Sequence, residues 1–312
     1  MAERDASCIS HKGESMSTES DFRGRSFEYL IATSMCNQMK GKFTARATAD
    51  NDRDAEKFKM LDEGTREDLS HAASAVPGIL DGLGFEIRNP VIDRLPDDVA
   101  KGGDPTDIRI VSEGFGLNLS IKNNHFALKH QRPNSLMQQL GLEKESPLDK
   151  VYRSRLKSVY GAFDNAVREM APRATTFECL KNTCPGCIEE KLYGPVCRIV
   201  CETLNSMSDK VEYATRYFRF LVGRTDFLKI IHHGGKIIVE DFSSIAMPRT
   251  FVAEQQSDEK YIGVCFDNGW RIMMRLHTAS SRFSRGKTPS LKFDTQLDSR
   301  YEKPYSSLEF RY

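Results

Sequence analysis

An aspartate, a serine and a lysine have the spacing of a metal-dependent hydrolytic site. Asp107 opens one apolar run, and Ser120 and Lys122 lie two residues apart in the next run. Residues i and i+2 of a strand face the same way, so pairing of the two runs would place Asp107 opposite the other two. Phosphodiester hydrolysis needs a hard cation, a carboxylate that holds it and a group that handles the attacking water. Asp107 is therefore the candidate magnesium ligand and Lys122 the candidate for the water, although an exposed hairpin can have this spacing by chance.

The elements that must position these residues follow from periodicity. The runs 107–111 and 117–122, joined by a turn at 114–116, predict a β-hairpin. Apolar residues at three- and four-residue spacing predict an amphipathic helix over 25–39, and a charged, solvated helical stretch follows over 50–79, punctuated by Pro77-Gly78. Further helices are predicted over 148–170, 195–207 and 210–221, and strands over 236–239, 261–265, 271–276 and 290–297, with a turn at Asp267-Asn268-Gly269.

Bulk composition indicates a globular protein with a large core. The chain has 312 residues, of which 39% are hydrophobic and 29% charged. It contains no apolar run long enough for a membrane span and no signal-peptide pattern, so a cytoplasmic location is expected. Residues 1–20 are predicted to be a disordered tail. Residues 21–312 are predicted to be a single composite domain, with a catalytic core over 21–145, a helical, Cys-rich segment over 146–225 and a strand-rich recognition part over 226–312.

Four blocks of sequence resemble the HaeIII family of type II restriction endonucleases. In GDPTDIRIVSEGFGLNLSIKNNHFALKHQRP, the Asp and the Ser-x-Lys strand are followed by Asn, His and a Lys-His-x-Arg run, as in that family. GRSFEYLIATSM precedes this block, and FLVGRTDFLKII and then NGWRIMMRLHTASSRF with SLKFDTQL follow it. The blocks run in the family's order from residue 24 to residue 297, so the resemblance covers most of the chain.

This resemblance implies an α/β fold of the PD-(D/E)xK type, a mixed sheet flanked by helices, with a helical middle segment and a strand-rich C-terminal part. It implies magnesium-dependent cleavage of double-stranded DNA, GGCC as the recognised site and a cognate DNA methyltransferase as functional partner. A symmetric site makes a homodimer attractive. Two alternatives stay open: a nicking or repair nuclease of the same fold, and a catalytically inactive DNA-binding module, which Ser120 suggests because most members of the superfamily have Glu or Asp at that position.

The family pattern also implies a second acidic group at the catalytic centre. Glu28, on the predicted first helix, would join Asp107 as a metal ligand. The main-chain carbonyl of Ile121 and water molecules would complete the coordination, because magnesium commonly keeps several waters. The alternative for Glu28 is an ordinary carboxylate on a helix surface.

Two runs without Asp or Glu, 114–142 and 268–293, are the candidate DNA-binding surface of a chain whose net charge is only +1. Arg275, Arg282 and Arg285 are the candidates for pairing with guanine, which arginine contacts through two hydrogen bonds. Ordinary solvated charges are the alternative. The predicted DNA-binding residues are Asn124, His125, Lys129, His130, Arg132, Arg275, His277, Ser280, Ser281, Arg282, Arg285 and Lys292.

A cluster of cysteines invites the hypothesis of a structural Zn²⁺ ion, because CxxC spacing suits tetrahedral zinc. Its members are Cys179, Cys184, Cys187, Cys197 and Cys201. Cys197 and Cys201, however, lie four residues apart on an apolar predicted helix, where cysteine commonly packs as a small hydrophobic residue. Reduced thiols in a core or a loop are therefore the alternative, and without an export signal disulfides are not expected.

Overall fold

The computed structural model describes residues 12–96 and 103–312, and the side chains from residue 19 onward. It divides into two compact units, which we describe separately. Unit 1 comprises Met1–His125, Thr225–Ser243 and Tyr305–Tyr312, and unit 2 comprises Phe126–Arg224 and Ser244–Pro304. Of the predicted tail, residues 1–11 lie outside the described residues and residues 12–20 belong to the first helix. The expectation of one composite domain stays a prediction.

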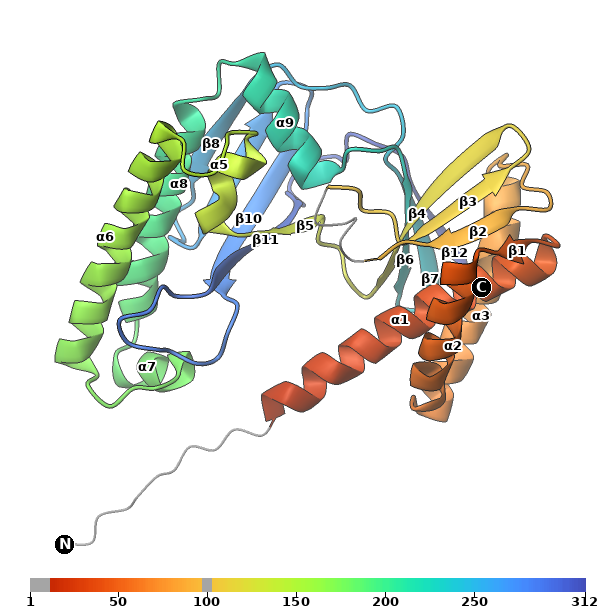
Figure 1. The fold of residues 1–312 in the computed structure, drawn as a ribbon, viewed down its shortest axis with the longest axis horizontal. Helices are drawn as coiled ribbons and strands as arrows, with labels where there is room; N and C mark the ends of the chain where they lie inside the picture. Colours follow the sequence, from red (N-terminus) through yellow and green to blue (C-terminus); the bar gives the residue numbers. More distant parts are fainter. Residues whose placement is uncertain (1–11, 97–102) are drawn as a thin grey trace, which may run out of the picture. The chain divides into compact units, whose positions relative to one another are not determined.

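Unit 1 is built on a mixed seven-stranded sheet (Figure 1). Its strands, in spatial order, are β1 (Lys42–Phe43), β2 (Val91–Arg94), β3 (Ile108–Ser112), β4 (Phe115–Asn123), β6 (Leu228–His233), β7 (Lys236–Asp241) and β12 (Ser307–Arg311). The pairs β1–β2 and β4–β6 are parallel and the other neighbours are antiparallel. The predicted hairpin over 107–122 is confirmed as β3 and β4, with Gly114 in the left-handed conformation that the turn requires.

Three helices complete unit 1: α1 (Lys12–Gln38), α2 (Ala45–Lys59) and α3 (Glu63–Gly82). Helix α1 packs against both α2 and α3, and the predicted apolar stripe is its buried face, on which Phe27, Ile31 and Met35 have no exposed surface. This face joins side chains of the sheet, such as Ile110 and Ile230, in the hydrophobic core of the unit. The elements match a mixed α/β arrangement.

The interpretation of residues 50–79 as one solvated helix is wrong. The segment forms two helices, and α3 buries a full apolar face that includes Leu69, Val76 and Leu80. Pro77 lies inside α3 without ending it, because burial of this face offsets the cost of a proline in a helix, on the order of 3 kcal/mol. On α2, Asp54 has no exposed surface although the helix is rich in charge.

Unit 2 contains an antiparallel five-stranded sheet with the order β5 (Lys129–Gln131), β11 (Leu291–Leu297), β10 (Arg271–Thr278), β9 (Tyr261–Phe266) and β8 (Phe251–Gln255). The predicted turn at Asp267-Asn268-Gly269 joins β9 to β10. Trp270, which follows this turn, is buried and meets Phe218 edge to face at 5.2 Å between ring centroids. Aromatic side chains therefore fix the sheet to a helix.

The predicted helices of the middle segment are confirmed in unit 2. They correspond to α6 (Pro147–Met170), α8 (Gly194–Asn205) and α9 (Val211–Val222). Shorter elements, which the sequence did not predict, are η1 (Pro133–Ser135), α5 (Leu136–Gln139), α7 (Phe177–Thr183) and a π-helical turn, η2 (Glu189–Tyr193). No helix within the described part of the chain is long and apolar enough to cross a membrane.

Candidate catalytic centre and nucleic-acid interface

Asp107 lies opposite Ser120 at the start of the β3–β4 hairpin. Three donors converge on one of its carboxylate oxygens, Oδ2: the Lys122 ammonium at 2.9 Å, the Ile121 main-chain N–H at 2.6 Å and the Ser120 hydroxyl at 3.4 Å. The other oxygen, Oδ1, accepts no hydrogen bond from the described residues. The side chains of Asp107 and Lys122 are 22% and 26% exposed, so the pair is partly buried but accessible. One oxygen is anchored and the other can take a cation.

Glu28 joins this centre from helix α1. It is only 9% exposed, which excludes the alternative of a helix-surface carboxylate. Burial raises the pKa of Glu28, and the nearby negative charge of Asp107 raises it further, while the guanidinium groups of Arg25 and Arg94 lower it. The two arginines contact the same oxygen, Oε2, at 3.1 and 2.8 Å. The structure thus brings together the two acids that the sequence proposed for one site.

Arg94 and Asp54 are buried charged residues that the sequence analysis missed. Arg94, the last residue of β2, is 2% exposed and lies 2.8 Å from both Glu28 and Asp54. Burial opposes ionisation of Asp54, but hydrogen bonds from Arg53 and the charge of Arg94 hold the pKa of this carboxyl below its usual range. Asn51 accepts a further hydrogen bond from Arg94, at 3.1 Å. These side chains form a connected polar network inside unit 1.

Asp104 fixes the loop that leads into the β3–β4 hairpin. Its Oδ1 accepts hydrogen bonds from the Thr106 N–H and the Thr225 hydroxyl, both at 3.0 Å, and its Oδ2 accepts one from Arg109 at 3.0 Å. Thr225 opens the segment that leads to β6. Asp104 therefore ties together two stretches of unit 1 and is a structural carboxylate.

The donor set of the centre suits a hard cation. Asp107 and Glu28 each keep one carboxylate oxygen that accepts no hydrogen bond from the described residues, and magnesium prefers oxygen ligands and retains waters. Across residues 12–96 and 103–312 no three His, Cys, Asp or Glu side chains gather closely enough to hold a metal ion by themselves. A cation here would therefore be shared between the two acids, main-chain oxygen and water. The proposed ligand role of the Ile121 carbonyl stays a prediction.

Just beyond Lys122, at the end of strand β4, two asparagines contact two histidines. Asn124, in the left-handed conformation with φ 52°, contacts His233 at 2.9 Å, and Asn123 contacts His232 at 3.0 Å. His232 is 3% exposed, and burial lowers its pKa. His232 is therefore a buried residue of β6. Asn124 and His125 are exposed, as a DNA-contacting role requires.

On the sheet of unit 2, four of the predicted DNA-binding residues surround a single carboxylate, Asp294. His130 and His277 each have a ring nitrogen 2.7 Å from it, and Arg275 lies at 3.2 Å and Lys292 at 3.9 Å. Asp294 was not predicted from the sequence because it lies one residue beyond the acid-free run 268–293. Its negative charge offsets the positive charge of Arg275 and Lys292, and its contacts fix the positions of the four side chains.

Two other predicted residues on this part of the chain behave differently. Lys129 lies 4.6 Å above the ring of Phe220, and burial, together with the charge of Arg224, lowers its pKa to about 8. Arg132 is exposed and donates to the Ser290 hydroxyl at 3.4 Å. Arg132 therefore lies at the surface, whereas the Lys129 ammonium is held against an aromatic ring.

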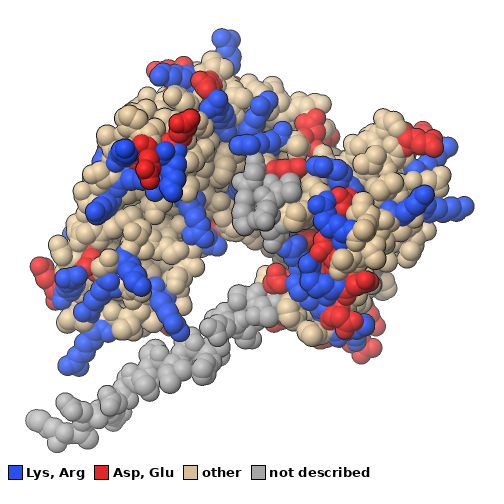
Figure 2. All heavy atoms as spheres, in the orientation of Figure 1, with Lys and Arg blue, Asp and Glu red and all other residues tan. Residues whose placement is uncertain are grey.

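The remaining predicted residues lie in the long loop between β10 and β11. Phe283 is buried between Phe163 and Phe177, with centroid distances of 5.7 and 5.6 Å, and anchors this loop to α6 and α7. Arg282 pairs with Thr176 through a β-bridge of their main chains. Ser280, Ser281, Arg282 and Arg285 are exposed around the anchor. Figure 2 shows the Lys and Arg side chains of the visible face in small groups with Asp and Glu side chains among them, as the near-neutral net charge implies.

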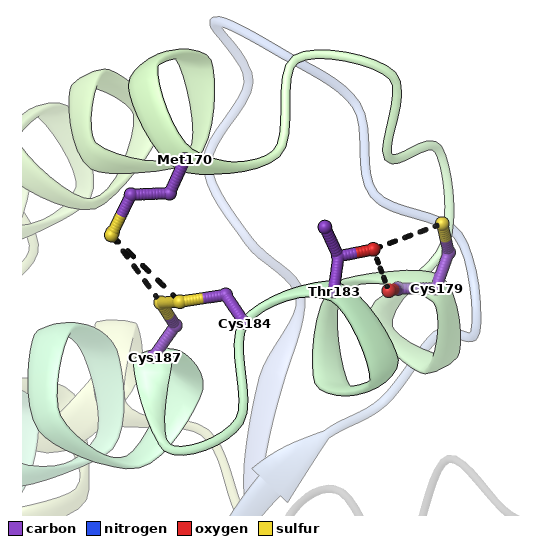
Figure 3. The surroundings of a disulfide bond; sticks show 5 residues. All are labelled: Met170, Cys179, Thr183, Cys184 and Cys187. Atoms are coloured by element: carbon purple, nitrogen blue, oxygen red, sulfur yellow. Dashed lines mark hydrogen bonds between the residues drawn. A yellow bond between two sulfur atoms is a disulfide. The ribbon is translucent and has the colours of Figure 1, made fainter.

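In the part of the chain that the structure describes, the five cysteines do not gather into a group that could hold a metal ion, and the hypothesis of a structural zinc is not confirmed. Cys184 and Cys187 are joined by a disulfide, contrary to the expectation of reduced thiols, and both sulfur atoms lie 3.8 Å from that of Met170 (Figure 3). Cys179 instead contacts Thr183 on its own helix. The other two, Cys197 and Cys201, are buried in the apolar face of α8, and burial raises the pKa of both thiols.

Comparison with known proteins adds an independent line of information. A family model described as HaeIII restriction endonuclease matches residues 24–240. A curated relative, the type II restriction enzyme HaeIII of Haemophilus aegyptius, is 22% identical over 90% of this chain and 95% of the relative. No solved structure matches. The matched family segment contains Glu28, Asp107, Ser120 and Lys122.

Proposed function

Because the chain belongs to the HaeIII restriction endonuclease family and is thus a type II site-specific deoxyribonuclease, we propose that Asp107, Glu28 and Lys122 form its magnesium-dependent catalytic centre. The observation that carries this proposal is the asymmetry of Asp107, with three donors on Oδ2 and none of the described residues on Oδ1. Such an arrangement holds a carboxylate rigidly and leaves one oxygen for a ligand. Sites that must place a cation against a phosphate need this rigidity.

In this proposal Asp107 and Glu28 would hold the cation through the carboxylate oxygens that accept no hydrogen bond from the described residues, and the Ile121 carbonyl and water would complete its ligands. The chemistry that magnesium would supply there is neutralisation of charge on the scissile phosphate and activation of the attacking water. Lys122, whose ammonium lies 2.9 Å from Asp107 Oδ2, orients the attacking water and stabilises the negative charge that develops on the phosphate. Its contact with the anchored oxygen fixes the ammonium at the edge of the site.

Ser120 is the residue at which this centre departs from the wider superfamily, where Glu or Asp is usual. It is 2% exposed, and its hydroxyl donates to Asp107 at 3.4 Å. A carboxylate at this position would add a third acidic group to Asp107 and Glu28, in a buried place where like charges repel strongly. We propose that Glu28 takes over the ligand role, and that the Ser120 hydroxyl supports the orientation of Asp107.

We propose double-stranded DNA containing GGCC as the substrate, because the resemblance to the HaeIII family implies this recognised site. Arginine is the side chain that pairs with guanine through two hydrogen bonds, and Arg275, Arg282 and Arg285 are exposed in unit 2. A palindromic site would be cut by two copies of the chain related by twofold symmetry, and a cognate methyltransferase would protect host DNA.

A catalytically inactive DNA-binding module is the second candidate, favoured by the loss of the usual carboxylate at Ser120. A nicking or repair nuclease would share the same centre and differ in strand count and specificity. Retention of the Asp107–Lys122 contact at 2.9 Å supports an active enzyme.

Incubation of unmethylated plasmid DNA with the purified protein, in magnesium or in EDTA, tests the proposal. We expect discrete magnesium-dependent fragments whose ends map to GGCC, and no fragments with Asp107→Ala or Lys122→Ala. Plasmid methylated at this site should resist cleavage. Singly nicked circles would favour the nicking or repair enzyme, and DNA binding without cleavage in magnesium would contradict the catalytic assignment in favour of the binding module.

A further inference from the structure

Arg94 is the most deeply buried guanidinium near the catalytic centre, and the mechanism above does not use it. Its side chain is 2% exposed at the end of β2, between helices α1 and α2. One nitrogen, Nη2, lies 2.8 Å from Glu28 Oε2 and 2.8 Å from Asp54 Oδ2, and the other, Nη1, donates to Asn51 Oδ1 at 3.1 Å. A buried charge is retained only where such partners offset its desolvation.

The contacts of Arg94 define how Glu28 is oriented. Arg94 and Arg25 both contact Oε2 of Glu28, while Oε1 accepts no hydrogen bond from the described residues. This is the arrangement seen at Asp107, where donors hold one oxygen and leave the other free. In each acid the anchored oxygen sets the direction in which the remaining oxygen points.

Asp54 in turn holds Arg94 in place. It has no exposed surface, and Arg53 donates hydrogen bonds to its two oxygens at 3.0 Å each. The planar guanidinium of Arg94 reaches Glu28, Asp54 and Asn51 at once, a geometry that the single ammonium of a lysine does not reproduce.

We propose that Arg94 is a positioning residue for the catalytic cation: it fixes Glu28 Oε2 so that Oε1 faces the cation shared with Asp107. This inference rests on the proposed function. Groups that orient metal ligands typically change metal affinity or activity by about 10- to 100-fold when removed. Loss of Arg94 should therefore weaken cation binding itself, and not only the stability of unit 1.

The test measures Mn²⁺ binding by the full-length protein without DNA, from the electron paramagnetic resonance of free Mn²⁺, next to the magnesium dependence of plasmid cleavage. Arg94→Met, Arg94→Lys and Asp54→Asn are compared with Glu28→Gln and Asp107→Ala. Arg46→Met is the matched control, because Arg46 pairs with Asp93, the neighbour of Arg94 on β2, and its side chain is 44% exposed. Circular dichroism and thermal unfolding report whether each variant is folded.

We expect Mn²⁺ affinity to fall about 10- to 100-fold in Arg94→Met, in parallel with Glu28→Gln, and to fall less in Arg94→Lys. The magnesium concentration for half-maximal cleavage should rise by a similar factor, while Arg46→Met stays like wild type. If Arg94→Met does not fold, Arg94→Lys and Asp54→Asn decide the matter. Wild-type Mn²⁺ affinity in the folded variants at Arg94 and Asp54 would overturn the positioning role alone, whereas wild-type affinity in Asp107→Ala would overturn the proposed centre.

Discussion

Neutralising the basic side chains of the β10–β11 loop should weaken the salt dependence of DNA binding by a calculable amount. The variant replaces Arg282, Arg285 and Lys287 with Gln. All three side chains are exposed, and Phe283, which anchors the loop, is untouched. The bridge between Arg282 and Thr176 uses main-chain atoms and survives the substitution. We therefore expect the loop to keep its conformation and lose only its charge.

The magnitude follows from the number of phosphates that the basic side chains contact, because each contact releases counterions from the DNA. Each phosphate contact contributes about 0.9 to the slope of log affinity against log salt concentration, so three contacts contribute about 2.7. Between roughly 50 and 200 mM salt, a slope difference of this size means that wild-type affinity falls about 40-fold more than that of the variant. If one of the arginines contacts a base instead of a phosphate, the change in slope is smaller and discrimination against altered sites is lost.

Fluorescence anisotropy with a labelled GGCC duplex, in calcium to prevent cleavage, measures these slopes. The control replaces Lys150, Arg155 and Lys157, three exposed basic residues of α6, with Gln and removes the same charge. An unchanged slope in the loop variant, or an equal change in the control, would refute the assignment of this loop to the DNA interface.

Three further predictions concern other parts of the molecule. Lys122→Met should reduce the cleavage rate by about 10²- to 10⁴-fold with little change in thermal stability. The control, Lys236→Met, breaks an exposed ion pair with Glu309 on the same sheet and should leave the cleavage rate and the stability nearly unchanged. A Lys122→Met enzyme with wild-type activity would disprove the role of this lysine. Folding lowers the pKa of Lys129 to about 8, so the unfolded chain binds more protons than the folded one between that pH and about 10.4. The free energy of unfolding measured with urea should therefore rise with pH across this window, and Lys129→Met should abolish the rise. Treatment with 1,10-phenanthroline should leave the melting temperature unchanged, since Cys184 and Cys187 are paired with each other; a fall that added zinc reverses would contradict this.

Local patterns in the sequence predicted the parts of the fold that depend on neighbouring residues. The hairpin that places Asp107 opposite Ser120 and Lys122 needs only alternation and a glycine turn, and both are readable. The buried stripe of α1 and the strand pairs of the C-terminal part follow from the same periodicities. Because Lys122 and Asp107 lie in one hairpin, their proximity was predictable.

The parts that were not predicted depend on contacts between distant segments. Strand β6 pairs in parallel with β4 across more than a hundred residues, and nothing local in either strand specifies that partner. Asp54 lies in a helix so rich in charge that its pattern indicated a solvated face, yet it is fully buried because Arg94, forty residues away, neutralises it. The ionic contacts of Asp294 likewise could not be predicted, because they form only when β5, β10 and β11 bring four basic or imidazole side chains around it.

The order in which the chain visits the two units has a consequence for biosynthesis. Unit 1 requires residues 305–312, which follow all of unit 2 in the chain and supply strand β12 and Tyr312. The Tyr312 hydroxyl contacts both His232 and Asp68, so this last segment fastens β6 to α3. Domains generally fold in the order in which the ribosome releases them. All of unit 2 thus precedes these residues in the chain, whereas the sheet that contains Asp107 and Lys122 is completed only when residues 305–312 have been synthesised and β12 has paired with β7.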